Sequence, residues 1–180
     1  MNYRAELRDI ANENHGVVTV RAAREAGVPA VEVRKLAHRG ALERLGYGVY
    51  RMIDAPRGPL DEFAEAVALV GEGALLADEA VLAAHNLGQV NLRRIPVVSS
   101  ARVRRALPAT IQVVHRDVAE RDRSDVEGIP AMTVAAALRQ TAPTMLPERV
   151  ARAALTAAAR GLISEDDKDR LTRPIRQGVA

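Results

Sequence analysis

Two glycine-ended helical segments, followed directly by a glycine-tipped hairpin, constrain the fold of this chain more than any other feature. They lie between Thr19 and Met52. Thr19 is suited to the N-cap of a helix over residues 20–26, because its hydroxyl can accept a backbone N–H that the first turn leaves unpaired. Gly27 suits the left-handed position after that helix. The sequence therefore predicts a short helix and a tight turn.

A second helix is expected directly after this turn, over residues 30–39. Pro29 lacks an N–H and is typical of a helix first turn, and Gly40 provides the stop. One helical face carries Val33, Leu36 and Ala37, which predicts contact with a core that Val28 and Leu42 also reach. The opposite face is exposed and mostly basic, and it carries Ala30, Val31, Arg34, Lys35 and His38.

The hairpin that follows consists of two β-compatible runs, residues 42–45 and 49–52. Gly46-Tyr47-Gly48 between them can supply the positive φ of a tight turn. Helix, turn, helix and hairpin together are the pattern of a winged helix-turn-helix, whose second helix enters a DNA major groove. The alternative is an ordinary helical hairpin with a solvated charged face, and the hairpin directly afterward favours DNA binding.

The residues expected to contact DNA come from both parts of this motif. The helical face is expected to meet base edges, and the hairpin to meet phosphates or a minor groove. The predicted contacts are Thr19, Arg21, Ala30, Val31, Arg34, Lys35, His38, Arg44, Tyr47 and Arg51.

Charge is distributed unevenly along the 180 residues, whose net charge is +3. Residues 1–58 hold 10 Arg or Lys against 7 Asp or Glu, whereas the rest holds 16 of each. The basic surplus thus coincides with the predicted DNA-binding motif, as expected for a nucleic-acid module joined to a neutral one. There is no cysteine, and no apolar run approaches the roughly 20 residues of a membrane span. With no signal-like N-terminus either, the chain is expected to be cytoplasmic and not to contact a membrane.

The domain organisation is expected to follow a linker at residues 54–59, which is rich in Pro and Gly. Residues 1–53 form the predicted winged helix-turn-helix domain. Residues 60–180 are predicted to form a mixed α/β domain rich in helices, with short strands at 95–99 and 111–114 and a further strand or turn at 126–130. The predicted fold class is therefore α+β.

No catalytic constellation is evident, and we expect neither an enzyme nor a bound cofactor or metal. The Glu165-Asp-Asp-Lys168 cluster is similar to those of metal-dependent nucleases, but it lies in a predicted helix first turn, whereas such carboxylates usually lie on strands. A group of arginines surrounds the two expected strands of the second region. It is either a solvated surface balanced by nearby acids, which we favour, or a second basic patch. These arginines are Arg93, Arg94, Arg102, Arg104, Arg105 and Arg116.

Three stretches resemble the AbiEi-type antitoxins of abortive-infection (type IV) toxin-antitoxin systems. The first is Gly27–Arg51, with its glycine-ended helix followed by Leu-Glu-Arg-Leu and Gly-Val-Tyr-Arg. The second is Leu76–Leu87, a small-residue helix that ends in His-Asn-Leu, and the third is Glu127–Val134, similar to a strand-to-helix junction. The chain departs from the family at Ala30 and Val31, where family members often have polar or basic residues. Small apolar side chains there can still meet thymine methyl groups.

The resemblance implies a winged helix-turn-helix followed by an antitoxin domain. It also implies binding to double-stranded DNA at inverted repeats in its own promoter, and opposition to a nucleotidyltransferase toxin. The expected function is thus an autoregulating repressor that is also an antitoxin. Two alternatives remain: an antitoxin that acts by direct contact with the toxin, and a stand-alone regulator gated by a ligand or partner.

Overall fold

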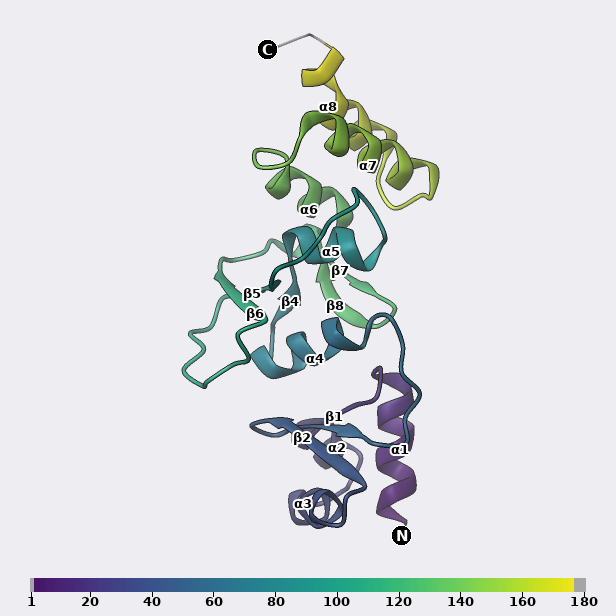
Figure 1. The fold of residues 1–180 in the computed structure, drawn as a ribbon, viewed down its shortest axis with the longest axis vertical. Coiled ribbons are helices and arrows are strands. Elements are labelled where there is room, and N and C mark those ends of the chain that lie inside the picture. Colours follow the sequence, from purple (N-terminus) through teal and green to yellow (C-terminus); the bar gives the residue numbers. More distant parts are fainter. Residues whose placement is uncertain (1, 177–180) are drawn as a thin grey trace.

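The N-terminal region is a three-stranded antiparallel sheet with three helices, at one end of an elongated molecule (Figure 1). The computed structural model describes residues 2–176, and it describes side-chain burial up to residue 173. The strand order is β1-β3-β2, so β3 lies in the centre. In chain order the elements are α1 (Tyr3–Glu13), β1 (Val17–Thr19), α2 (Val20–Glu25), α3 (Ala30–His38), β2 (Leu42–Gly46) and β3 (Val49–Met52).

Both helices of the predicted helix-turn-helix end as their glycines indicate. After α2, Gly27 has a φ of +79°, and its N–H donates to Arg24 O while the N–H of Val28 donates to Ala23 O. After α3, Gly40 closes the helix in the same way with a φ of +75°. These paired bonds form the Schellman motif, which satisfies the last carbonyls of each helix. The local prediction of helix, turn and helix is therefore confirmed.

The C-terminal region contains a five-stranded mixed sheet of order β6-β5-β4-β8-β7. The β5–β6 and β4–β8 pairs are parallel, and the β4–β5 and β7–β8 pairs are antiparallel. Helices α4 and α5 lie on opposite sides of this sheet, and α6, α7 and α8 extend to the end of the molecule far from α3 (Figure 1). In chain order the elements are α4 (Asp61–Val70), β4 (Leu75–Leu76), α5 (Asp78–Ala84), β5 (Ile95–Ser99), β6 (Ile111–His115), the 3-10 turn η1 (Glu120–Asp122), β7 (Arg123–Val126), β8 (Ile129–Met132), α6 (Val134–Thr141), α7 (Pro147–Ala159) and α8 (Glu165–Arg176).

This architecture confirms the predicted α+β class, with some differences in detail. The strands expected at 95–99 and 111–114 are present, and the expected strand or turn at 126–130 is the tip of the β7–β8 hairpin. Strand β4 was not predicted, because two residues are too few to show a periodicity. It is nevertheless the central strand, since it pairs with both β5 and β8.

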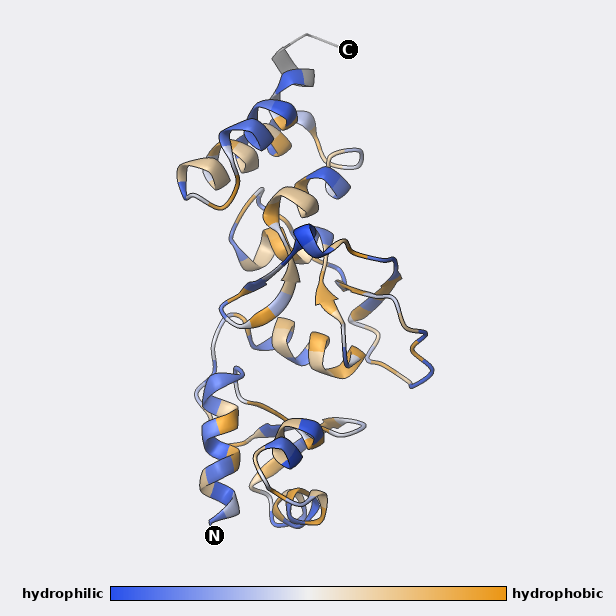
Figure 2. Cartoon of the chain, turned by 180° about the vertical axis from the view of Figure 1, so that it is seen from behind, coloured by the Kyte–Doolittle hydropathy of each residue, from blue (hydrophilic) through white to orange (hydrophobic). Residues whose placement is uncertain are grey.

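The two regions share part of one hydrophobic core. Val17 of β1 and Val49 of β3 belong to the cluster built by α4, the five-stranded sheet and α5 to α7, while a smaller cluster lies between α1, α2, α3 and the first sheet. Figure 2 shows α4 as a largely hydrophobic helix between the two sheets. No described helix is both long and apolar enough to cross a membrane.

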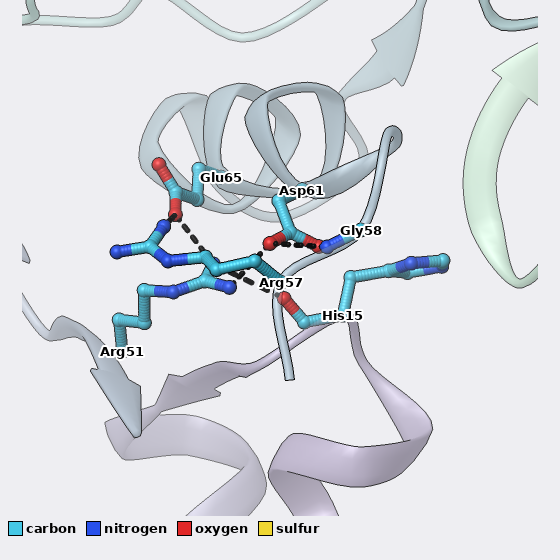
Figure 3. Close-up of polar contacts among 6 residues, drawn as sticks. All are labelled: His15, Arg51, Arg57, Gly58, Asp61 and Glu65. Atoms are coloured by element: carbon cyan, nitrogen blue, oxygen red, sulfur yellow. Dashed lines mark hydrogen bonds and ion pairs between the residues drawn. The ribbon is translucent and has the colours of Figure 1, made fainter. Parts of the chain in front are cut away.

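A buried ion cluster also joins the regions, and Arg51 is its centre (Figure 3). Its guanidinium donates to the Asp61 carboxylate, to Glu65 Oε1 at 2.6 Å, and to the backbone oxygen of His15 at 3.2 Å. The Arg51 side chain is 1% exposed, and that of Asp61 is 10% exposed. Asp61 also accepts the N–H of Gly58 at 3.0 Å, so the end of the expected linker is held as well. The first turns of α4 thus neutralise a charge that lies inside the molecule.

The beginning of the expected linker is tied to α1. Asp54 pairs with Arg4 at 3.1 Å and with Arg8. The hydrogen bond from Arg8 is the main reason that the pKa of the Asp54 carboxyl lies below its usual value. Residues 53–60 contain no helix or strand, yet both ends of this segment are held by ion pairs.

We predict that Asp61→Ala destabilises the protein by about 3–5 kcal/mol, because it removes the more buried of the two carboxylates that neutralise the buried Arg51. Chemical denaturation at neutral pH measures this loss as a lower midpoint. The matched control is Glu62→Ala on the same turn of α4, since Glu62 is exposed. That variant is expected to change stability by no more than about 0.5 kcal/mol. Equal midpoints for the two variants would contradict this role of Asp61.

Candidate nucleic-acid interface

Helix α3 is held by its apolar face and presents its basic face to solvent. Val33 is fully buried, and Leu36 and Ala37 pack partly against the same cluster, together with Val28 and Leu42. On the other side Arg34, Lys35 and His38 lie toward solvent with Val31, which is 45% exposed, and Ala30 is half-buried. Lys35 Nζ pairs with Glu32 Oε1 at 2.8 Å, and the two residues lie one helical turn apart on α3. The predicted division of α3 into two faces is confirmed.

The wing is the β2–β3 hairpin, and it projects an aromatic residue at its tip. Tyr47 is 77% exposed between Gly46 and Gly48, and Gly48 has a φ of +70°. The strand register shifts between Arg44 and Gly46, which marks a bulge that bends the hairpin. Arg44 is exposed, and its Nε donates to Gly46 O at 3.3 Å. The bulge and this bond hold the Arg44 side chain close to the wing tip.

Gly46 also fixes the wing against α4. A Cβ at this position would overlap the side chain of Leu69, so no larger residue fits without movement. The wing therefore packs on the C-terminal region directly beside its tip, while Tyr47 itself stays exposed.

The structure contradicts the prediction that Arg51 is a surface cation of the wing. Residue 51 lies on the central strand β3, opposite Val17 on β1 and Glu43 on β2. Alternate residues of a strand point to opposite faces, and the face that carries Arg51 is covered by α4. Arg51 therefore does not belong to the interface.

The two predicted residues around the start of α2 are placed differently from each other. Thr19 is half-buried, and its hydroxyl accepts the N–H of Ala22 at 3.0 Å, so it acts as the predicted N-cap. Arg21 is exposed and pairs with Glu25 at 2.8 Å and with Glu72 at 2.5 Å. Its hydrogen bond with Glu25, followed by that with Glu72, raises the pKa of the Arg21 guanidinium above its ordinary value. Because Glu72 lies in the turn after α4, Arg21 forms a second ionic contact between the regions.

A cleft of about 1180 Å³ lies between the helix-turn-helix with its wing and the C-terminal region. Its walls come from α2, α3 and the wing on one side, and from the end of α4, the α4–β4 turn and the β7–β8 turn on the other. The acidic residues in its lining are Glu25 and Glu72. The arginines in its lining are Arg21, Arg24, Arg34, Arg44 and Arg105. The cleft is therefore a mainly basic concave surface.

Two of these arginines, Arg24 and Arg105, extend the predicted site. Arg24 lies one helical turn after Arg21 and is exposed, so its spacing on α2 was an available signal. Arg105 donates to Val70 O at 3.0 Å at the end of α4. That contact joins residues far apart in the sequence, and no local pattern indicates it.

The arginines considered as a possible second basic patch do not form one patch. Arg93 and Arg94 precede β5, whereas Arg102, Arg104 and Arg105 follow it. Since β5 and β6 run parallel, Arg116 lies beyond the same end of the sheet as Arg102 and away from Arg93. Arg116 is 27% exposed and turned inward, where it pairs with Asp78 at 2.7 Å and contacts Gln140 at 3.3 Å. The structure thus divides the group into separate sites and gives Arg116 a structural contact.

The geometry offers contacts for a polyanion. The outward residues are cationic, aromatic or small, and α3 stands beside a protruding wing. Among the described residues there is no group of three or more His, Cys, Asp or Glu side chains placed to bind a metal ion.

Comparison with known proteins identifies the family that the N-terminal region resembles. Residues 5–53 match a family model described as a transcriptional regulator, AbiEi antitoxin. This stretch runs from α1 to the segment after β3, and the match confirms the AbiEi resemblance for it. The other two stretches that carry the resemblance, Leu76–Leu87 and Glu127–Val134, lie outside the matched residues.

The remaining comparisons concern the whole chain. No match is found among curated proteins. A solved structure described as the crystal structure of RV2827C protein from Mycobacterium tuberculosis is similar over 95% of this chain and 71% of that chain, with 21% identity and a TM-score of 0.49.

Proposed function

We propose that this protein is a DNA-binding repressor of its own operon and that it also acts as the antitoxin to a nucleotidyltransferase toxin. The observation that carries the DNA-binding part is the exposed basic face of α3 beside a glycine-tipped wing. The family match over residues 5–53 supports the same conclusion, since that family is described as transcriptional regulators and antitoxins.

In this proposal α3 enters the major groove. Arg34 lines the basic cleft and forms no ion pair with the described side chains, so its planar fork is available for the O6 and N7 atoms of a guanine. Val31 and Ala30 at the start of α3 fit thymine methyl groups. Lys35 and His38 lie further along the same face.

The wing and the cleft supply contacts to the DNA backbone. Arg44 and Tyr47 lie at the exposed end of the hairpin, where phosphate contacts fix the position of the protein without reading sequence. Arg24 and Arg105 line the same cleft and add positive charge on either side of it. Phosphate binding would also compete with Glu72 for Arg21.

The antitoxin activity is proposed for residues 60–180. These residues hold equal numbers of acidic and basic residues, and we assign them no catalytic role. In one alternative these residues act by direct contact with the toxin. A pull-down with the tagged toxin tests this. For the ligand-gated alternative, the cleft is the candidate ligand site, because it lies between the helix-turn-helix with its wing and the C-terminal region.

We predict that Arg34→Ala weakens binding to the DNA upstream of its own gene by about 1–3 kcal/mol, because alanine cannot form the two hydrogen bonds to guanine. A gel shift with the full-length protein measures this change. Arg170→Ala is the matched control, since Arg170 is exposed on α8 at the opposite end of the molecule. Thermal unfolding should be unaltered in both variants. Unchanged affinity in the double variant Arg34→Ala/Lys35→Ala would remove α3 from the interface.

A different signature is expected for the wing. Arg44→Ala should weaken operator and unrelated DNA alike, because a phosphate contact carries no sequence information. The slope of log K against log salt should become shallower by about 0.9, because the variant neutralises one phosphate fewer. Binding measured over a range of salt concentrations tests this, and a loss of affinity confined to the operator would contradict it.

Co-expression with the proposed nucleotidyltransferase toxin separates the two activities. The toxin is placed under an unrelated promoter, so that repression cannot account for any protection. We predict that the wild type and the Arg34→Ala/Lys35→Ala variant both restore growth, because the proposed antitoxin residues are intact in both. Failure of that variant to protect would show that the two activities are not divided in this way. The full chain is required, since a piece ending at residue 58 leaves Arg51 without Asp61 and Glu65.

A further inference from the structure

The loop after α5 runs along one flank of α7, in the half of the molecule far from α3 (Figure 1). Helix α5 ends in a Schellman motif at Asn86, which has a φ of +54°: Asn86 N–H donates to Ala83 O and Leu87 N–H donates to Leu82 O. The backbone of Asn86 is thus used by the cap, whereas its side chain remains available. Leu87 is buried and anchors the loop.

A small pocket of about 120 Å³ lies between this loop and α7. The polar residues that line it are Asn86, Gln89, Arg149, Arg152 and Thr156. Each of these five side chains can donate a hydrogen bond, and the lining contains no carboxylate. A concave site lined by hydrogen-bond donors and by no acid is suited to an oxyanion.

The two arginines of this pocket have no partner in the described part of the protein. Several other arginines of the C-terminal region are paired, such as Arg116 with Asp78 and Arg139 with Asp122. By contrast, Arg149 and Arg152 form neither an ion pair nor a side-chain hydrogen bond with any described residue, although Glu148 is their neighbour on α7. Two like charges one helical turn apart repel each other, and an anion between them removes that cost.

The pocket is built on a fixed backbone. Gly88 has a φ of +70°, and a Cβ there would approach Met145 Cε to 3.1 Å and Ala153 Cβ to 3.7 Å. Gln89 has a φ of +50°, which is uncommon for a residue with a side chain and is not explained by the helix cap. At the start of the loop, His85 O accepts a hydrogen bond at 2.6 Å from Arg160, which follows the last turn of α7. The loop is therefore held against α7 from both ends.

We propose that this pocket binds a phosphate group, with Arg149 and Arg152 as its charged ligands and Asn86, Gln89 and Thr156 as neutral donors. Arginine suits this role because its planar fork can bind two oxygens of a phosphate at once. The phosphate comes either from free inorganic phosphate or from a nucleotide. The site is separate from α3 and the wing, and it does not depend on the proposed DNA binding.

Nuclear magnetic resonance of the full-length protein tests the site. Inorganic phosphate is added at constant ionic strength, and amide shifts are expected at residues 86–89 and on the first half of α7. The double variant Arg149→Gln/Arg152→Gln should weaken binding about tenfold or more, because it removes two charge-assisted hydrogen bonds. The control Arg170→Gln/Arg173→Gln removes two exposed arginines of α8 and should bind phosphate as the wild type does.

A parallel titration with ATP distinguishes the two sources. Tighter binding of ATP at the same residues supports the site and identifies a nucleotide, and equal binding supports it with free phosphate as the ligand. The proposal is overturned if the shifts at 86–89 are absent, if they persist in Arg149→Gln/Arg152→Gln, or if glutamate produces them and phosphate does not. The same double variant should retain operator binding in a gel shift, so failure here is distinct from failure of the DNA-binding proposal.

Discussion

The buried charge of Arg51 is the constraint on which the arrangement of this molecule depends. A guanidinium is costly to remove from water, and it is tolerated inside a protein only when its charge and hydrogen bonds are satisfied. Here Asp61 and Glu65 of α4 supply the charge, and the backbone oxygen of His15 supplies a further acceptor. Since Arg51 lies on the central strand of the first sheet, α4 cannot leave that sheet without exposing the whole cluster. The N-terminal and C-terminal regions are therefore coupled by electrostatics as well as by apolar packing.

This coupling explains several close approaches around the cluster. A Cβ at Gly16 would lie 3.0 Å from Arg51 Nη2, so the chain passes directly over the guanidinium. Gly46, beside the wing tip, meets Leu69 of α4 in the same way. In addition, His15 Nε2 lies 2.9 Å from Glu127 O, and Arg21 pairs with Glu72. The last three contacts join the N-terminal region to α4, to the β7–β8 turn and to the α4–β4 turn, and residues of all three segments line the basic cleft.

The elements and caps of the helix-turn-helix could be predicted because their causes are local. Thr19 caps α2 with its own hydroxyl, and Gly27 and Gly40 adopt positive φ where the helices end. The 3.6-residue period of α3 places Val33 on the buried face and leaves Arg34 exposed. Each of these features depends on residues only a few positions apart. Sequence reasoning therefore reached α3, the wing and most of the candidate interface.

The sequence alone thus determined the fold class, the helix-turn-helix with its wing, and the outward residues of α3 and the wing tip. Only the tertiary structure decided what becomes of a charged residue whose partners lie on another element. Arg51 and Arg44 are both arginines of one hairpin, yet α4 covers the first and solvent surrounds the second. Arg116 was grouped with surface arginines, but α5 and α6 supply Asp78 and Gln140 beside it. The pairing of the two-residue strand β4 with β5 and β8 is non-local in the same sense. The physical reason is that the burial of a charge depends on which distant segment packs over it, and a periodicity along one segment carries no information about that neighbour.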